Sequence, residues 1–574
     1  MQGDRTLARD IRGEIEKQVG EQAAVSVGEG IARLSGRCSS HDTAVQAGFL
    51  AAGFDRIREV VNDLVFPGKM RFKPRRRISE ELTGKEFDVV IVGGGVIGLA
   101  VARELSQFDL SIALFERHND LGMDQTSHSC AMIHPAIQAE YGTLRWEMNY
   151  RGNAMWDETA RQLDVDFRRV GTLIVAETQE EEKLLPYVLD MAAKHNDPEP
   201  KLLDREGLDR VEPGLVPHVT KGVLIWNTGI ISVFELVIAY AENALSNGVS
   251  IFLDTSVLGI HTEDSAVRAV DTDRGTVRAR ILINAAGLYA DRIAEYAGDR
   301  FFTIHPRKGE TIIFDKSYQP VRTVFAPVSM AAESRESKHS KGGGIIPTTD
   351  GNLQFGPTAF EVCDREDVAT TAEGCDSLYT RFAPLLERLK PEYEKPDRGK
   401  IITQFAGCRA ATYKEDFIIE PSRKVRGLVH AAGIQSPGLA SAPAIAERIR
   451  EIARDEWLPS PNEDFDPVRK RQVRLAELQL DDQDKLIRDD QLYGHIVCRC
   501  EDTSEAEVVR ALHGPLAARS VDGVKRRTRA GQGRCQGGFC MPRIVEIISR
   551  EMDTARHHVV KSDGRSYILS KRTK

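Results

Sequence analysis

The sequence predicts an α/β protein in which a nucleotide-binding domain is flanked by a small α+β module and a small cysteine-rich domain. Three observations predict this class. Strand-like and helix-like segments alternate between residues 87 and 455, which is the pattern of an α/β fold. A G-x-G-x-x-G motif lies between the first of these strands and the first helix. Four of the nine cysteines are close together near the C-terminus, outside the alternating region.

Length and composition exclude several classes of protein. A chain of 574 residues is expected to form about two to four domains. The net charge of −8 argues against a nucleic-acid-binding protein. The first residues are charged and lack the apolar core of a secretory signal, and no apolar run approaches the ~18 residues of a membrane span. We therefore expect a cytoplasmic protein, with peripheral attachment to the inner face of the membrane as the alternative.

Residues 1–68 form the predicted N-terminal module. A helical pattern is followed by an alternating stretch at Val25–Gly36, a second helical pattern and a closing apolar stretch at Arg58–Phe66. This order of helix, strands, helix and strand, with VVNDL at Val60–Leu64, resembles the BON domain. Residues 69–86 are basic and are expected to form a solvated linker, with contact to anionic lipid as the alternative.

The glycine motif follows a short buried-strand pattern, Phe87–Val92, and precedes a helical pattern. Gly93 permits the tight turn, Gly95 lets the backbone approach a pyrophosphate at the helix N-terminus, and Gly98 allows close helix–strand packing. A second strand pattern ends at Glu116, where a carboxylate can accept hydrogen bonds from ribose hydroxyls. The strand–turn–helix context and the terminal acid together predict a dinucleotide site.

Two further segments bear on whether the dinucleotide is FAD or NAD. Ile281–Asp291 is an apolar strand that ends in small residues, which allow a cofactor to approach closely. Val429–Ala446 is a strand, a glycine-rich turn and a helix, whose N-terminus can face the negatively charged end of a reduced flavin. Each segment also fits an ordinary strand–turn–helix corner, so neither alone decides the cofactor.

Together these segments resemble the D-amino-acid-oxidase-like superfamily of FAD oxidoreductases, over about Phe87–Arg450, and within it especially the glycerol-3-phosphate and L-2-hydroxyglutarate dehydrogenases. The resemblance implies FAD, a Rossmann-like FAD-binding domain and a mixed-sheet substrate domain, within residues 87–455. It extends over the segments Thr126–Ile137, Pro306–Glu310, Gly351–Ala359 and Phe405–Thr412. The residues expected at the cofactor are Gly93, Gly95, Gly98, Glu116, Thr126, Ser127, Ala286, Gly287, Gly433, Ile434, Gly438 and Leu439.

Two departures from these families leave the substrate open. Hydroxyglutarate dehydrogenases usually have Asn-Ser-Gly before an Ile-His pair, whereas this chain has Ser-Cys-Ala at Ser129–Ala131. Glycerol-3-phosphate dehydrogenases usually end the flavin loop with a Gly-Gly-Lys and Thr pattern, whereas this chain has Gly-Ile-Gln-Ser-Pro-Gly at Gly433–Gly438.

The clustered cysteines lie beyond a polar linker, residues 456–490, in a region expected to form a small helical domain, residues 491–574. Their pattern is C-x-C, 34 residues, then C-x4-C, which fits a [2Fe–2S] cluster, a [4Fe–4S] cluster or a structural zinc. The segment Gly494–Ile548 resembles the bacterioferritin-associated-ferredoxin-like [2Fe–2S] domain, which is also carried by the large subunit of anaerobic glycerol-3-phosphate dehydrogenases. The resemblance implies a [2Fe–2S] cluster on Cys498, Cys500, Cys535 and Cys540.

A flavin fused to an iron–sulfur domain predicts a dehydrogenase that takes a hydride from a small anionic substrate and sends single electrons onward. We expect a secondary alcohol, glycerol 3-phosphate first, and a quinone or redox protein as the acceptor. His134 is the candidate base, because histidine titrates near neutral pH. Arg409, Arg307 and Lys308 are the candidates to hold the anion.

Three alternatives remain open at this point. The substrate can be L-2-hydroxyglutarate or another 2-hydroxy acid, because the chain resembles that family as well. It can be an amino or imino acid, as for many members of the superfamily. The chain can also be mainly an electron-transfer subunit of a larger complex, in which the N-terminal module docks it to a partner subunit or to a membrane surface.

Overall fold

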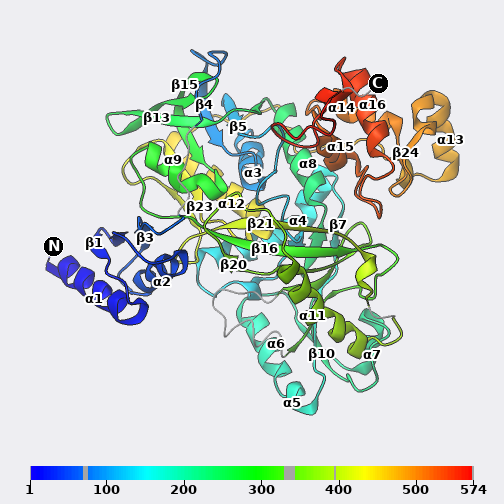
Figure 1. Ribbon diagram of the computed structural model, residues 1–574, viewed down its shortest axis with the longest axis horizontal. Coiled ribbons are helices and arrows are strands. Elements are labelled where there is room, and N and C mark those ends of the chain that lie inside the picture. The colour runs from blue at the N-terminus through cyan, green and yellow to red at the C-terminus, as the bar shows by residue number, and fades with distance from the viewer. Residues whose placement is uncertain (1, 69–74, 329–342, 394–395, 572–574) are drawn as a thin grey trace.

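The computed structural model describes residues 2–68, 75–328, 343–393 and 396–571 (Figure 1). Residues 69–74 of the predicted linker lie outside this part of the chain. The fold class expected from the sequence is confirmed: parallel and mixed sheets are combined with many helices, and the C-terminal region is small and helical. Within the described ranges, no helix combines the length and apolar character needed to cross a membrane.

The N-terminal module is a small sheet of order β1-β2-β3 packed against two helices. β1 and β2 are antiparallel, and the turn between them uses the positive φ angles of Glu29 (54°) and Gly30 (76°). The α2 helix begins with a capping box, in which Ser40 and Thr43 satisfy each other's backbone amides. The elements are α1 (Gln2–Val19), β1 (Ala24–Gly28), β2 (Ile31–Ser35), α2 (His41–Ala52) and β3 (Glu59–Asn62).

The dinucleotide-binding domain is built on a sheet of order β12-β5-β4-β15-β14-β13, with β23 beside β15. Its central strands are parallel, so their carboxyl ends meet at one edge, next to the predicted cofactor residues. The parallel strands are β4 (Glu86–Val92), β5 (Ile112–Phe115), β12 (Ser250–Phe252), β15 (Gly275–Asn284) and β23 (Leu428–Ala432). The antiparallel strands are β13 (Val257–Glu263), β14 (Ala266–Thr272) and β22 (Ile418–Pro421).

Helices cover both faces of this sheet. Val89 and Ile91 of β4 face one hydrophobic cluster, and Val90 and Val92 face another, because side chains alternate along a strand. The first cluster includes residues of α3, α4, α8 and α12, and the second includes residues of α9. These helices are α3 (Val96–Leu105), α4 (Leu144–Leu163), α8 (Val233–Ser246), α9 (Ala290–Tyr296) and α12 (Gly438–Trp457).

The substrate domain contains a mixed sheet of order β20-β16-β19-β18-β17-β8-β10-β9, in which β21 also pairs with β16. Apolar side chains of α11 (Ala372–Leu389) pack against this sheet. The strands are β8 (Thr172–Val175), β9 (Lys201–Leu203), β10 (Gly222–Ile225), β16 (His305–Phe314), β17 (Val324–Pro327), β18 (Gly344–Pro347), β19 (Leu353–Gly356), β20 (Phe360–Glu361) and β21 (Ile401–Ala411).

Smaller elements complete the substrate domain. The strands β6 and β7 flank β11 in a separate small sheet, and three further helices lie at the far end of the domain in Figure 1. These elements are β6 (Met132–Ile133), β7 (Phe167–Arg169), β11 (Gly229–Ile231), α5 (Gln179–Glu182), α6 (Leu185–Lys194) and α7 (Arg205–Val211).

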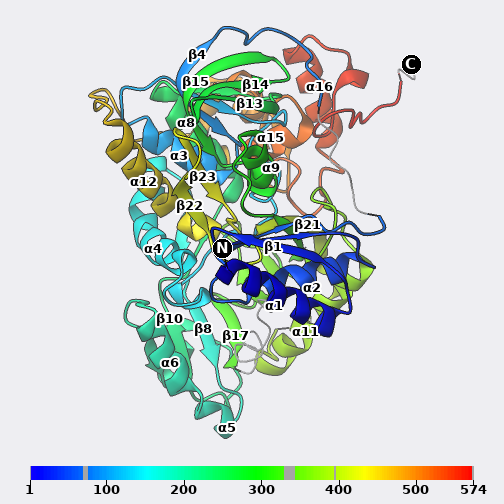
Figure 2. The ribbon, with the colours of Figure 1, turned by 90° about the vertical axis from the view of Figure 1, so that its left-hand side faces the viewer.

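The C-terminal domain lies beside α8 and far from the N-terminal module (Figures 1 and 2). It is preceded by α13 (Leu480–Asp489), so the predicted linker 456–490 contains a helix. The buried faces of its helices enclose a separate apolar core. Its elements are β24 (Ile496–Cys498), β25 (Thr503–Ser504), α14 (Glu505–His513), α15 (Val521–Thr528) and α16 (Met541–Glu551).

Candidate active site and redox centre

The glycine-rich loop has the geometry that a bound pyrophosphate requires. Gly93 has a φ of +112°, and a Cβ there would overlap the carbonyl of Ala285. A Cβ at Gly98 would overlap the carbonyl oxygen of Gly93, so only glycine lets α3 pack so closely. Gly95 is the N-cap of α3, and the nearest atom to a Cβ there is Thr126 Oγ1 at 3.2 Å. The N-terminal end of α3 is therefore open to an anionic ligand.

Glu116 directly follows β5 and is buried beside this loop. Its two oxygens accept hydrogen bonds from the backbone amides of Gly94 and His118, both at 2.8 Å. Burial raises the pKa of Glu116, while the amides and the nearby His118 oppose that change. The carboxylate is thus held at the strand end where a ribose is expected, as the sequence predicted.

One cavity of about 2320 Å³ joins the nucleotide loop to the substrate domain. Ordinary small-molecule pockets measure about 300–1,000 Å³, so this cavity has room for an extended dinucleotide and a small substrate. Its lining includes the predicted residues Gly93, Gly95, Glu116, Thr126, Ala286, Ile434, Gly438, Leu439, His134, Arg409 and Gly287. Five predicted residues do not line it, namely Gly98, Ser127, Gly433, Arg307 and Lys308.

The flavin-side loop brings a second helix N-terminus to the cavity. The segment after β23 turns at Gly433, whose φ of +66° favours glycine, and leads to Gly438 at the start of α12. A Cβ at Gly433 would lie 2.8 Å from Thr412 Cγ2, so the residue serves close packing. The positive end of the α12 dipole faces the side of the cavity where the resemblance places the flavin ring. These features fit FAD, with the pyrophosphate at α3 and the ring near α12.

His134 follows β6 and is buried within the cavity wall. Its Nε2 lies 3.4 Å from Ser436 Oγ of the flavin-side loop, and its backbone carbonyl accepts a hydrogen bond from Asn153. The structure therefore brings the candidate base to the same place as the loop that the sequence assigned to the flavin ring.

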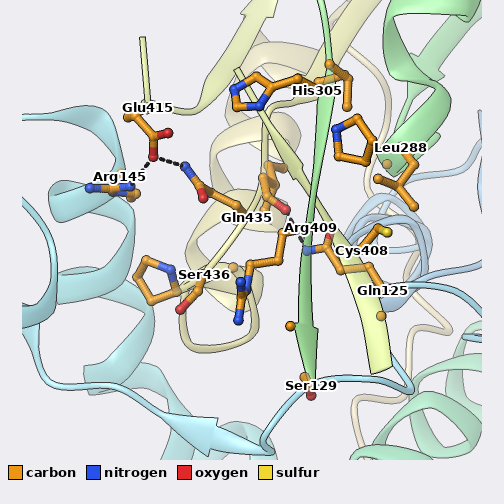
Figure 3. A pocket seen from close by; sticks show the side chains of 18 of the residues that line it. Gln125, Ser129, Arg145, Leu288, His305, Cys408, Arg409, Glu415, Gln435 and Ser436 are labelled. Carbon is orange, nitrogen blue, oxygen red and sulfur yellow. Dashed lines mark hydrogen bonds and ion pairs between the residues drawn. The ribbon is translucent and has the colours of Figure 1, made fainter. Parts of the chain in front are cut away.

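Arg409 on β21 points into the middle of the site (Figure 3). Its Nη2 donates a hydrogen bond of 3.1 Å to the carbonyl of Thr358, and no carboxylate among the described residues forms an ion pair with it. Burial and the nearby Arg307 lower its pKa to about 10, so it is still a cation at neutral pH. Its side chain remains partly accessible because the cavity reaches it.

The other two predicted cations are held by carboxylates. Arg307 lies opposite Arg409 across the β16–β21 pair, and it contacts Glu361 at 2.6 Å and Glu415 at 2.5 Å. Lys308 is the next residue of β16 and therefore projects from the opposite face, where its Nζ lies 2.9 Å from Asp367. Arg307 and Arg409 are brought together, whereas Lys308 is not.

The sequence did not single out Arg145, Glu415 or Gln435. Glu415 lies between the other two in Figure 3: it accepts a hydrogen bond of 2.6 Å from Gln435, and its Oε2 is 3.7 Å from Arg145 Nη1. The Nε of Arg145 is buried and has no hydrogen-bond partner in the described part of the chain. Arg145 lies in the first turn of α4, far along the chain from Glu415, so only the tertiary structure reveals the cluster.

The four clustered cysteines come together as two pairs. Cys500 Sγ lies 3.8 Å from Cys535 Sγ, and Cys540 forms a hydrogen bond with Cys498. That hydrogen bond and the backbone amides, including that of Gly531, together lower the pKa of Cys498 to about 6, although burial opposes the change. Amide donors around thiolates are typical of iron–sulfur sites.

The arrangement of these thiols favours a cluster over a single ion. Structural zinc needs four ligands around one point, whereas a two-iron cluster needs two thiolates at each iron. Cys498 and Cys540 are buried and Cys535 is exposed, so one edge of the site faces solvent.

Comparisons with known proteins agree with this geometry. Residues 88–452 match the family model for FAD dependent oxidoreductases, and residues 496–550 match the BFD-like [2Fe-2S] binding domain. The chain is 39% identical to a glycerol 3-phosphate dehydrogenase of Caloramator mitchellensis, over 85% of this chain and 99% of that protein. It is 28% identical to a glycerol 3-phosphate oxidase of Mycoplasma genitalium, over 66% of this chain and 98% of that protein.

Two further similarities concern a dehydrogenase and a solved structure. The human mitochondrial L-2-hydroxyglutarate dehydrogenase is 29% identical, over 50% of this chain and 64% of that protein. A solved structure of L-alpha-glycerophosphate oxidase from Mycoplasma pneumoniae, with FAD bound, is 26% identical with a TM-score of 0.60, covering 68% of this chain and all of that one. The chain therefore belongs to the family of FAD dependent oxidoreductases, and it is an FAD enzyme that resembles glycerol 3-phosphate dehydrogenases and carries a [2Fe–2S] domain.

Proposed function

We propose that the protein oxidises the secondary alcohol of glycerol 3-phosphate and passes the electrons through its [2Fe–2S] cluster to a quinone or a redox protein. The observation that carries the substrate class is Arg409, a cation inside the cavity that has no ion pair with a described carboxylate. A phosphate dianion supplies the missing counter-charge. The dehydrogenase and oxidase relatives, whose names specify glycerol 3-phosphate, support this assignment.

FAD held in the cavity between the N-termini of α3 and α12 would supply a hydride acceptor, and a [2Fe–2S] cluster on Cys498, Cys500, Cys535 and Cys540 would supply one-electron transfer. His134 accepts the proton that leaves the hydroxyl oxygen. Loss of this proton and of the hydride converts the secondary alcohol to a ketone. The position of His134 beside Ser436, in the flavin-side wall, supports this role.

Arg409 and Arg145 hold the phosphate in this proposal. Arg409 presents a forked guanidinium, and Arg145 presents a buried Nε that no described group uses. Arg307 has a supporting task, because Glu361 and Glu415 already engage its guanidinium. Lys308 stabilises the sheet through Asp367 rather than touching the substrate.

Anaerobic mixing with glycerol 3-phosphate tests the proposal. We expect glycerol 3-phosphate to bleach the flavin absorption and glycerol to leave it unchanged. Arg409→Ala removes a charge-assisted contact of roughly 1.5–3 kcal/mol, which corresponds to about a tenfold to hundredfold loss of kcat/KM. Arg409→Lys should recover only part of it, because an ammonium cannot make the two-pronged contact. The exposed Arg454, which pairs with Asp455 on the surface, provides the matched control Arg454→Ala.

Reduction of the flavin by a different substrate would contradict the assignment of glycerol 3-phosphate. Bleaching by L-2-hydroxyglutarate and not by glycerol 3-phosphate would assign the enzyme to the 2-hydroxy acids. Bleaching only by an amino or imino acid would show that the substrate class is wrong while the cofactor assignment stands.

A further inference from the structure

The N-terminal module shares its hydrophobic core with the oxidoreductase domain. Tyr413, just beyond β21, is buried among module residues of α1, α2 and the small sheet. Conversely, Ile31 and Val61 of the module pack in one cluster with Phe301 and Phe302 of the oxidoreductase domain. Figure 2 shows the module lying across the domain beside β21. A shared core of this kind differs from a module that is merely tethered by a linker.

Tyr413 is held in place by two features of the module. Gly48 of α2 faces its ring so closely that a Cβ would lie 2.5 Å from Cζ and 2.7 Å from Cδ1. Asn62 of β3 donates hydrogen bonds to the Tyr413 hydroxyl, at 3.0 Å, and to the carbonyl of Ala44, at 2.7 Å. The tyrosine ring is thus seated against α2 and fixed at its hydroxyl end.

Tyr413 is linked by two chains of contacts to the arginines of the candidate site, Arg307 and Arg145. Two residues further along the chain, Glu415 has a φ of +59° and contacts Arg307, Gln435 and Arg145. Across the ring, the His305 imidazole stacks on Tyr413 with centroids 4.5 Å apart and planes inclined by 18°.

The second route ends at the same arginine. His305 Nδ1 lies 2.7 Å from Glu361, whose other oxygen accepts the hydrogen bond of Arg307 Nε at 2.6 Å. Both carboxylates that engage Arg307 are therefore linked to Tyr413, Glu415 through the chain and Glu361 through His305. Arg307 in turn lies across the strand pair from Arg409.

We propose that the N-terminal module is a positioning part of the substrate site. By fixing Tyr413, the module keeps Glu415 and Glu361 where they hold Arg307 and Arg145 in place beside Arg409. The family match begins at residue 88, so the module is an addition to the matched oxidoreductase region. The substrate named below rests on the proposed function, but the positioning role concerns any anion that occupies the cationic site.

Gly48→Ala tests the role, with Gly13→Ala as its matched control. Both replace a helical glycine of the module, but a Cβ at Gly13 meets nothing within 4 Å. Tyr413→Phe is the milder second variant, because it removes only the hydroxyl contacted by Asn62. FAD content and melting temperature identify any variant that fails to fold.

Two readouts separate positioning from a general loss of structure. We expect Gly48→Ala to raise the KM for glycerol 3-phosphate about tenfold while kcat changes less than about twofold, and Tyr413→Phe to raise KM about threefold. The dissociation constant for inorganic sulfate, followed by its effect on the flavin absorption, should rise in parallel, because sulfate tests the cations without turnover. Gly13→Ala should match the wild type in both measurements.

The outcomes distinguish this proposal from the proposed function. If glycerol 3-phosphate does not reduce the wild-type flavin, the substrate assignment fails, and the sulfate series still decides the role of the module. Unchanged sulfate and substrate constants in folded Gly48→Ala and Tyr413→Phe would overturn the positioning role, as would a wild type that does not bind sulfate.

Discussion

Arg527 of the C-terminal domain forms a buried ion pair with Asp120, with Nη2 2.9 Å from Oδ1. Arg526 contacts the other oxygen of Asp120 at 2.7 Å. Burial alone would raise the pKa of Asp120, but the two guanidinium groups hold it below its usual value. Asp120 lies between Glu116 and Thr126, so the iron–sulfur domain is clamped onto the loop that lines the cofactor cavity.

The first prediction concerns this clamp. Asp120→Asn removes the charge that both arginines share, and breaking a buried pair costs about 3–5 kcal/mol. We expect flavin reduction by substrate to keep its rate while electron passage from the flavin to the cluster slows. Rapid mixing that follows flavin and cluster absorption separately measures both steps.

A surface pair between the same domains provides the control. Asp254 and Arg519 are 3.6 Å apart and about half exposed, so Asp254→Asn should have little effect. Equal behaviour of the two variants would contradict a specific role for the Asp120 clamp.

The second prediction concerns the cluster ligands. Cys500→Ser or Cys535→Ser should remove the cluster, which needs about two irons per chain, while FAD remains bound in its separate domain. Substrate should still bleach the flavin, and transfer to an external acceptor should fall. Cys363→Ser is the control, because Cys363 is an exposed free thiol outside the cluster region. Zinc without iron in protein purified anaerobically would contradict the electron route.

The third prediction separates cofactor binding from folding at the glycine-rich loop. At Gly95 an added Cβ meets only Thr126 Oγ1, at 3.2 Å, so we expect Gly95→Val to fold but to exclude the pyrophosphate and lose FAD. At Gly98 an added Cβ overlaps the Gly93 carbonyl, so Gly98→Ala should lower the melting temperature itself. Flavin content and thermal unfolding of both variants test this difference. Full FAD retention in folded Gly95→Val would show that the loop only packs β4 against α3 and does not bind the pyrophosphate.

The fourth prediction concerns pH and the N-terminal module. Burial raises the pKa of Glu59 from 4.5 to about 8, while Lys414 and Arg58 oppose that change and Asp416 favours it. The folded protein therefore keeps a proton that the unfolded chain releases above about pH 4.5. Stability should fall as the pH rises from about 5 to 8, by at most ~1.4 kcal/mol per pH unit.

Glu59→Gln tests this linkage, because a glutamine is neutral at every pH. Unfolding measured in denaturant at pH 5.5 and 8 should show a smaller difference in the variant than in the wild type. An equal pH dependence in both proteins would mean that another group is responsible.

Local patterns were enough to predict much of this protein. The strand–turn–helix order around Gly93, Gly95 and Gly98 follows from short-range steric rules, and the structure shows the close contacts that those rules require. The two cofactors were likewise predicted, from the glycine motif and the cysteine spacing, and the family matches confirm both. The likeness of residues 1–68 to a BON domain, the electron acceptor and the assigned roles of the site residues remain predictions.

The sequence by itself determined the fold class and the two cofactors, since these follow from the alternation of strands and helices and from short motifs. Only the tertiary structure decided which of the predicted cations line the cavity. Strand pairing sets Arg307 opposite Arg409, and the alternation of side chains turns Lys308 to the other face. Folding also brings Arg145 and Glu415 together and places Tyr413 against Gly48, because long-range packing follows from the summed burial of apolar surface and not from any local pattern.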